Sequence, residues 1–421
     1  MNNLTLNQIS HNSHLPSQVK FKFFTPGVII LCLFALNGLV FLAGRFLFGI
    51  GSVTNLNNFY PWGLWIGVDV AAGVALAAGG FTSAALGHVM HKDEYHSIVR
   101  PALLTALLGY TFVACGVFVD IGRYYYIWHP LVMWNGNSAL FEVGICVMIY
   151  LTVLYIEFLP LVTERFMGRV KMWGFLKIFN PILEFFLRLT DKTINKVMFI
   201  FIIAGVVLST LHQSSLGTLM VIAGDKMHPL WQTPVLPLLF LVSAISVGFP
   251  MVIFESILAS RSFKLAPEMH VLSKLGSMVG PILGIYLAFK LGDMFIRETF
   301  VYLKELTFPA IMFYSEMIIG VIVPLIMFLN KKVLQSSKLL FTASSLVIFG
   351  VLLNRINNFI TAYKPPYAKV AYYPSIGELS VTIGFVAMLV LFYRACVMIF
   401  PVITQNHNHV EIAKTKSKVI L

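Results

Sequence analysis

The chain has 421 residues, of which 58% are apolar and only 11% are charged. Soluble domains carry about 25% charged residues, so this chain has too little polar surface to cover a water-soluble globule of its length. Together with a mean hydropathy of +0.83, this composition excludes disordered, fibrous and nucleic-acid-binding proteins and predicts an all-α, polytopic membrane protein. The net charge of +12 does not indicate nucleic acid, because Lys and Arg lie in short loops beside apolar segments.

Ten apolar segments are each close to the about 20 residues that cross about 30 Å of hydrocarbon. We expect membrane spans at about 25–48, 61–88, 99–121, 138–161, 194–217, 234–259, 270–292, 308–329, 338–362 and 376–400. Pro250, Pro281 and Pro324 lie inside spans, where proline predicts a kink.

The distribution of basic residues predicts the orientation of the chain. An even number of spans puts both termini on one side, and most of the 30 Lys and Arg residues lie on that side. Arg45 and Lys290 belong to the smaller set counted on the opposite side. The positive-inside rule therefore predicts cytoplasmic tails at 1–24 and 401–421.

Residues 171–189 mix basic and acidic side chains with bulky apolar ones. This segment is too charged to cross the membrane. We expect an amphipathic helix, kinked at Pro181, in the cytoplasmic interface; the alternative is a plain linker.

Ionisable residues inside the spans are costly and often line functional paths. Helix rise places five of them in the outer half of the membrane, which suggests one polar chamber there: Asp69, Asp120, Glu142, His212 and Glu316. Glu157 and Glu255 lie in the cytoplasmic third, and Glu142 and Glu157 share one helix face about 22 Å long. With Tyr110 they suggest a proton path, and polar packing between helices is the alternative.

Two local patterns suggest roles in the outer chamber. Asp120 and Arg123 are spaced i to i+3, which lets them pair on one helix face, either to anchor a helix end or to hold a polar headgroup. His212 precedes Gln213 in the run HQSSLG, and beside Glu142 it has the chemistry to donate a proton to a reducible carbonyl. A helix-packing hydrogen bond is the alternative for His212.

Haem, iron–sulfur clusters and metal sites are not expected in this chain. A bis-histidine haem needs two histidines on facing spans, and only His212 lies well inside one. The four cysteines lie far apart in apolar segments without CxxC spacing.

Several stretches resemble one known family. They include FGIGSVTNLNNFYPWGLWIGVDV (48–70), VRPALLTALLGYTF (99–112), FVDIGRYYY (118–126), NSALFEVGICVMIYL (137–151), LHQSSLGTLM (211–220), MHPLWQ (227–232), VIFESIL (252–258) and AYYPSIGELSVTIGF (371–385). In these motifs the chain is similar to the membrane subunits of periplasmic, quinone-linked nickel–iron hydrogenases. These form the HybB branch of the NrfD/polysulfide-reductase membrane-subunit family. The similarity extends over about residues 25–400.

The resemblance implies two four-helix bundles, spans 2–5 and 6–9, with spans 1 and 10 added, in a bacterial inner membrane. It implies a haem-free subunit that binds menaquinone or ubiquinone near the periplasmic face. A ferredoxin-like iron–sulfur subunit docks there and carries electrons from the hydrogenase large and small subunits. The family's quinone and proton-path positions match Trp62, Asp69, Tyr110, Asp120, Arg123, Glu142, His212, Gln213 and Glu255 here.

We therefore hypothesise a quinone-reactive subunit, not catalytic on its own, that couples hydrogen oxidation to quinone reduction and proton translocation. His212 and Glu142 would supply protons, with Asp120 and Arg123 holding the geometry. The alternatives are a membrane subunit of another NrfD-type respiratory oxidoreductase, a secondary transporter and a purely structural anchor.

Overall fold

The computed structural model describes residues 16–19, 21–89 and 95–404. Ten helices in these ranges are long and apolar enough to cross a membrane, so the predicted all-α, multi-pass membrane protein is confirmed. The spans are α2 (Pro26–Phe48); η2 (Trp65–Ala72) continued by α3 (Gly73–Leu76), α4 (Gly79–Ala84) and η3 (Ala85–Val89); α5 (His96–Asp120); α6 (Ala139–Phe166); α7 (Asn180–Ile222); α8 (Leu236–Phe263); α9 (Met269–Ile296); α10 (Phe308–Met317) continued by η10 (Ile318–Ile322) and α11 (Val323–Leu329); α13 (Ser337–Ile356) continued by η11 (Asn357–Thr361); and α14 (Ile376–Ile399).

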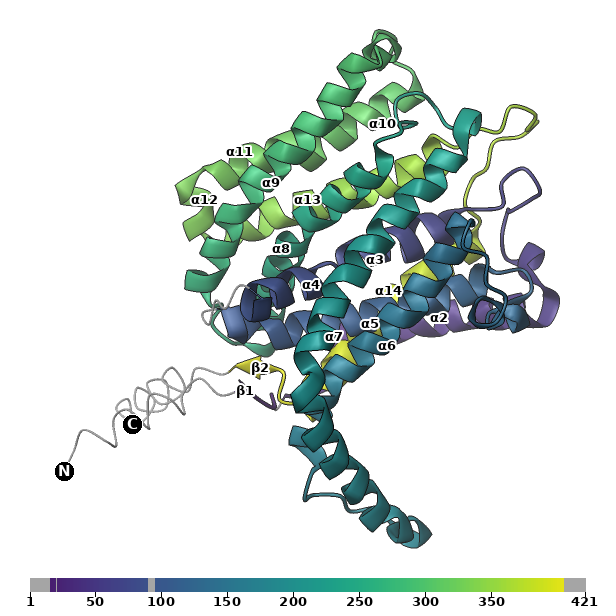
Figure 1. Cartoon of the computed structure of the whole chain (residues 1–421). Coiled ribbons are helices and arrows are strands. Elements are labelled where there is room, and N and C mark those ends of the chain that lie inside the picture. The colour runs from purple at the N-terminus through teal and green to yellow at the C-terminus, as the bar shows by residue number, and fades with distance from the viewer. Residues whose placement is uncertain (1–15, 20, 90–94, 405–421) are drawn as a thin grey trace.

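The helices form two bundles and one outer pair (Figure 1). The span η2–η3 packs with α5 and α7, and α6 packs with α5 and α7 in turn. Helix α8 packs with α9 and α13 beside α10–α11, and it also contacts α3, α4 and α7 of the first bundle. Helices α2 and α14 pack on each other, and α14 also contacts α5 and η2. Their crossing depends on two glycines, because a Cβ on Gly38 would lie 2.9 Å from the Gly384 Cα.

Both described ends of the chain lie at the same end of the helices. Strands β1 (Pro16–Ser17) and β2 (Ile403–Thr404) pair antiparallel there, and we call this the terminal face. The opposite end, with the loops 122–137 and 364–375, is the loop face. That the terminal face is cytoplasmic stays a prediction, and most of both tails lies outside the described residues.

Three spans contain π-helical segments, which hold one residue more per turn than an α-helix: η2 and η3 in one span, η10 in another and η11 in a third. Three of these segments lie beside a polar intramembrane residue. Asp69 lies within η2, Glu316 precedes η10 and Asn357 begins η11.

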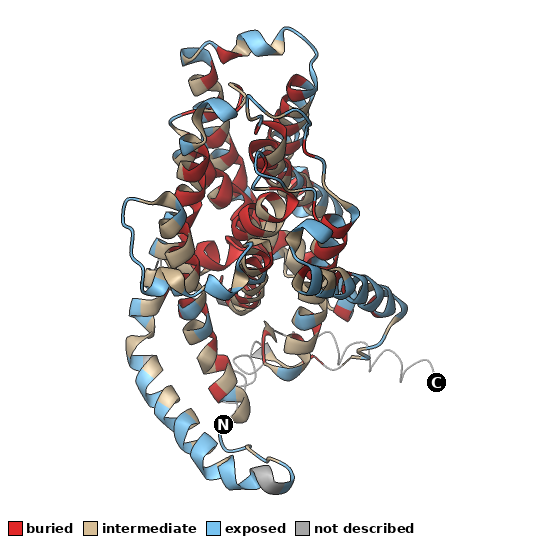
Figure 2. Ribbon diagram, turned by 90° about the vertical axis from the view of Figure 1, so that its right-hand side faces the viewer, coloured by how far each residue is buried: buried red, intermediate tan, exposed pale blue. Residues whose placement is uncertain are grey.

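The segment 171–189 differs from the prediction. It contains a short 3-10 helix, η7 (Gly174–Phe179), followed by the start of α7, a single helix of 43 residues. Pro181 lies in the first turn of α7, where its missing N–H costs nothing, so it begins a helix instead of kinking one. Figure 1 shows α7 bending as it leaves the bundle, and Figure 2 shows this extension as mostly exposed.

Candidate functional site

An apolar cavity of about 420 Å³ opens near the loop face of the first bundle, and we call it the loop-face cavity. Residues from four spans line it, and they include Trp62, Val70, Val117, Asp120, Val143 and Leu216. The volume falls within the range of about 300–1,000 Å³ typical of small-molecule sites. A few polar groups in a mainly apolar pocket suit a ring-shaped apolar ligand that carries oxygen atoms.

Asp120 is the carboxylate of this cavity. It is the last residue of α5, and its Oδ1 atom is screened from solvent and has no hydrogen-bond partner among the described residues. The predicted pair with Arg123 does not form, because α5 ends at Asp120 and Ile121 is extended. Arg123 is consequently exposed.

Arg45 of α2, not Arg123, stabilises this helix end. Arg45 is 2% exposed, and its guanidinium donates to the carbonyl oxygens of Val119 (2.7 Å) and Ile121 (2.6 Å). A cation at a helix C-terminus also compensates the negative end of the helix dipole. The charge of Arg45 acts on Asp120 as well, so the predicted cation of the site comes from another helix.

Glu142 and His212 lie beside the cavity but do not line it. Ser215 donates a hydrogen bond of 2.6 Å to the Glu142 carboxylate and thereby joins α7 to α6. The His212 side chain is fully buried, and its Nδ1 atom is 3.3 Å from the Tyr110 hydroxyl of α5. Its Nε2 atom has no partner among the described residues.

The two other predicted quinone ligands have partners of their own. Thr382 of α14 donates to Asp69 at 2.8 Å. Gln213 donates to the Val74 carbonyl at 2.9 Å, while its own amide oxygen is buried without a partner among the described residues.

The predicted proton-path residues are distributed along the first bundle and the adjoining helix α8. Tyr110 contacts both His212 and Tyr150, with the two tyrosine ring centroids 4.4 Å apart. Farther toward the terminal face, Glu157 packs against Gly205. A Cβ atom added to Gly205 would lie 2.7 Å from the Glu157 Oε1 atom. Glu255 lines a small cavity of about 60 Å³, which also reaches Glu268 at the terminal face.

Glu316 does not share a chamber with the other four outer carboxylate and histidine groups. It lies in the second bundle, 1% exposed, because α10 packs against α13 and not against the first bundle. Its carboxylate accepts hydrogen bonds from Trp231 Nε1 (3.0 Å), Asn354 Nδ2 (2.8 Å) and Asn357 Nδ2 (2.7 Å). The prediction of one outer chamber is therefore wrong, because the polar groups divide between the two bundles.

Two buried cations accompany Glu316. Arg355 is fully buried and donates to Asn354 Oδ1 at 2.6 Å and to Ser243 Oγ at 2.9 Å. Lys290 is 3% exposed and lies 5.5 Å from the centre of the Phe313 ring. The charge distribution predicts Lys290 on the outer side of the membrane next to a loop, but α9 continues past it to Ile296 and the residue is buried.

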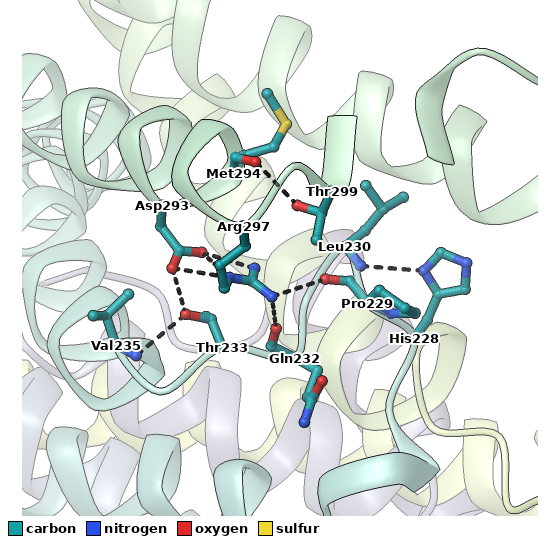
Figure 3. A network of polar contacts seen from close by, with 10 residues as sticks. All are labelled: His228, Pro229, Leu230, Gln232, Thr233, Val235, Asp293, Met294, Arg297 and Thr299. Carbon is teal, nitrogen blue, oxygen red and sulfur yellow. Dashed lines mark hydrogen bonds and ion pairs between the residues drawn. The ribbon is translucent and has the colours of Figure 1, made fainter. Parts of the chain in front are cut away.

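A polar network at the loop face fixes the segment between the two bundles (Figure 3). Arg297 pairs with Asp293 on α9 at 2.8 Å and also donates to the carbonyl oxygens of Pro229 and Gln232. Thr233 donates to the same Asp293 carboxylate at 2.7 Å. The MHPLWQ stretch is thus fastened to α9, which positions Trp231 toward Glu316.

Several residues of these clusters were missed by sequence reasoning. No local sequence pattern indicates the roles of Tyr150, Thr382 and Arg45. Each of them contacts its partner on another helix, distant in the sequence. Ser215 did carry a signal, since it lies in the run HQSSLG, one turn after His212 on the same helix. No group of three potential metal-ligating side chains exists among the described residues.

Comparison with known proteins identifies the family. The model of the family "Polysulphide reductase, NrfD" matches residues 52–364. The chain is 32% identical, over 96% of its length and all of the relative's, to the probable Ni/Fe-hydrogenase 2 b-type cytochrome subunit of Escherichia coli K12. It is 36% identical to a protein of Nitratidesulfovibrio vulgaris Hildenborough over 91% of this chain and 96% of that one. It is 25% identical to the menaquinone reductase integral membrane subunit of the same organism over 85% of this chain and 87% of the relative.

A match over most of the chain, with a relative above 30% identity that is covered completely, shows common descent and not merely a shared membrane character. The chain belongs to the NrfD polysulphide reductase family of membrane subunits.

Proposed function

We propose that the chain is the quinone-reactive membrane subunit of a hydrogenase complex in a bacterial inner membrane. Menaquinone or ubiquinone would be its substrate, and electrons would come from an iron–sulfur partner, because we expect no redox centre in this chain. The observation that carries the proposal is the loop-face cavity, which combines an apolar lining with an Asp120 oxygen that has no partner among the described residues.

We assign the direct contact with the quinone to Asp120 and Trp62, since both line the cavity. Arg45 would be a positioning residue that holds the end of α5. Glu142 and His212 would supply protons through the neighbouring hydrogen bonds to Ser215 and Tyr110 and not by direct contact.

A proton path toward the terminal face would continue from Tyr110 through Glu157 to Glu255. The spacing along α6 supports this, because Glu142 and Glu157 span about 22 Å of the membrane. The cavity between Glu255 and Glu268 has room for water at the terminal face. We propose that quinone reduction draws protons through this path and is therefore electrogenic.

The loop face offers a docking surface for the partners, which we propose are a ferredoxin-like iron–sulfur subunit and the nickel–iron hydrogenase large and small subunits. The loop that closes the cavity exposes large side chains, among them Tyr125 (56% exposed), Trp128 (50%) and Trp134 (79%). Exposed aromatic clusters of this kind are typical of protein interfaces.

We expect no haem, although the name of the Escherichia coli relative includes a b-type cytochrome. His88, His96 and His270 belong to segments at the terminal-face ends of their spans, and His129 and His228 lie near the loop face. These segments lie at the ends of the spans, whereas His212 lies within α7. A pyridine haemochrome assay on the purified complex checks this expectation.

The proposal is tested by hydrogen-driven menaquinone reduction in proteoliposomes that hold the complete complex, with a membrane-potential dye present. Asp120→Asn and Glu142→Gln should abolish quinone reduction while dye reduction by the hydrogenase continues. Glu305→Gln is the matched control, because Glu305 is an exposed loop carboxylate.

Retained quinone reduction in both site variants would contradict the site and favour a structural anchor. Quinone reduction without a membrane potential would keep the site and remove the Glu157–Glu255 path. Uptake of a solute by the chain without partners would favour a secondary transporter. Electron delivery from a partner other than hydrogenase would assign the chain to another oxidoreductase, as the names of its menaquinone reductase and selenate reductase relatives illustrate.

A further inference from the structure

We propose that the chain binds a second isoprenoid quinone or quinol near the terminal face, in a groove between α2, α8 and α14. The groove contains a cavity of about 380 Å³, which we call the terminal-face cavity. Its walls are mainly apolar, with Val28 and Leu31 from α2, Met251 and Phe254 from α8, and Val390 from α14. This volume is also typical of a small-molecule site.

Three polar groups gather in this cavity. Thr105 Oγ1, Glu255 Oε1 and Tyr393 OH are all screened from solvent, and the two hydroxyls lie beside the Glu255 carboxyl without completing well-aligned hydrogen bonds to it. All three residues line the cavity, and Thr105 is only 8% exposed. Buried polar groups in folded proteins nearly always complete their hydrogen bonds, so we infer that a bound molecule completes those of this cluster.

The chemistry of the three groups defines the headgroup. A carboxyl and two hydroxyls both donate and accept hydrogen bonds. A ring with oxygen atoms on opposite sides, as a carbonyl or a hydroxyl, satisfies such a set in its oxidised and in its reduced form. The apolar walls suit an isoprenoid chain.

The depth of the cluster argues against a phospholipid headgroup. Thr105 and Glu255 lie about two helical turns inside the terminal-face ends of their spans, at Ser97 and Phe263. At 1.5 Å per residue, this is about 12 Å into the membrane. A phosphate remains at the membrane surface, whereas a quinone ring enters the hydrocarbon.

The charged residues of the cavity also argue against a phospholipid headgroup. Arg394 is the cation of this cavity, but it is 8% exposed and donates to Ser262 Oγ at 2.9 Å and to the carbonyl oxygens of Lys22 and Phe23. Only its Nε atom has no partner among the described residues. A phosphate would meet a cation already engaged, next to the Glu255 carboxyl.

The two cavities are separate sites. Thr105 and Asp120 lie on the same helix, α5, about 22 Å apart along its axis. A ring held at Thr105 therefore cannot also contact Asp120. The second site lies far from the loop face, where electrons would enter, so we assign it to binding and exchange of quinone and not to its reduction.

Photolabelling tests the proposal. The complete complex in proteoliposomes is illuminated with an azido-menaquinone analogue, and labelled peptides are located by mass spectrometry. We expect label on α8 and α14 in addition to label around the loop-face cavity. Val390→Trp should fill the groove and lower α8 and α14 labelling at least tenfold, and Tyr393→Phe should weaken it. Val386→Trp is the matched control, because Val386 lies one turn away on α14, is 57% exposed and does not line the cavity.

Each outcome decides one of the two proposals. Label confined to the loop-face peptides, with Val390→Trp without effect, overturns the second site. Groove label that excess phospholipid displaces but excess unlabelled menaquinone does not would show a lipid site and also overturn it. Groove label without loop-face label would support the second site while contradicting the proposed function. Tyr393→Phe, which removes a single oxygen atom, decides the case if Val390→Trp fails to assemble.

Discussion

Replacing Glu316 by Ala should destabilise the second bundle strongly. The substitution removes three hydrogen bonds: it leaves the buried donors of Trp231 and Asn354 without an acceptor, and Asn357 keeps only a bond of 3.4 Å to the Met312 carbonyl. Interhelical hydrogen bonds in membrane proteins contribute about 0.6–1.7 kcal/mol each, so their loss amounts to about 2–5 kcal/mol. The buried charge of Arg355 also loses its nearby anion, which acts in the same direction.

The free energy of unfolding is measured on the purified chain in lipid nanodiscs or mild detergent, by titration with a denaturing detergent. Thr342→Val is the control, since Thr342 donates only to the Lys338 carbonyl of its own helix, at 3.0 Å. A loss below about 1 kcal/mol for Glu316→Ala would refute the reasoning, because it would mean that the network contributes no more than polar packing.

Three further predictions concern the loop face and the helix crossings. Burial lowers the pKa of His228, so the folded state resists protonation. The contribution of neutral His228 to stability should be fully present above about pH 6.5 and be lost as the pH drops below it. Thermal unfolding of His228→Gln should therefore show a smaller loss of stability between about pH 7.5 and 5.5 than the unsubstituted protein. Gly320→Ala would place a Cβ 2.3 Å from the Gly350 Cα and should cost about 1–3 kcal/mol, whereas Gly284→Ala, with no atom within 4 Å of the added Cβ, should leave the melting temperature unchanged. Arg45→Lys loses the guanidinium that binds two carbonyl oxygens at the end of α5. Quinone reduction should fall about tenfold because KM for the quinone rises, while dye reduction by the hydrogenase stays unchanged. An unchanged KM would remove Arg45 from the site.

The architecture could be predicted from the sequence, because each span must be apolar over a length set by the bilayer. The ten predicted spans correspond to ten helices, and the family resemblance agrees with the matched family. The extension of α7 was misjudged for a local reason. A proline flanked by apolar residues predicts a kink or a helix start equally well, and only the structure shows that Pro181 begins the helix.

The site was predicted less completely, because contacts between helices depend on how the helices rotate. Asp120, Glu142 and His212 were identified as polar residues in apolar spans, but their partners Arg45, Ser215 and Tyr110 come from other helices. Depth along a span can be calculated from helix rise, whereas the facing direction cannot once π-helical turns interrupt the period. Glu316 illustrates a second limit, since its depth suggested one chamber with Asp120 whereas its helix, α10, packs against α13 in the other bundle.

The π-helical segments also constrain how these sequences change by insertion and deletion. Each such turn holds one extra residue, so deleting a single residue from η2 would restore a regular α-helix and leave the residues beyond it on their present faces. The side chains of α3 and α4 would then still face α5 and α8. The same deletion in a regular helix such as α5 would rotate everything beyond it by about 100°, so single-residue deletions should be tolerated far better in η2 than in α5.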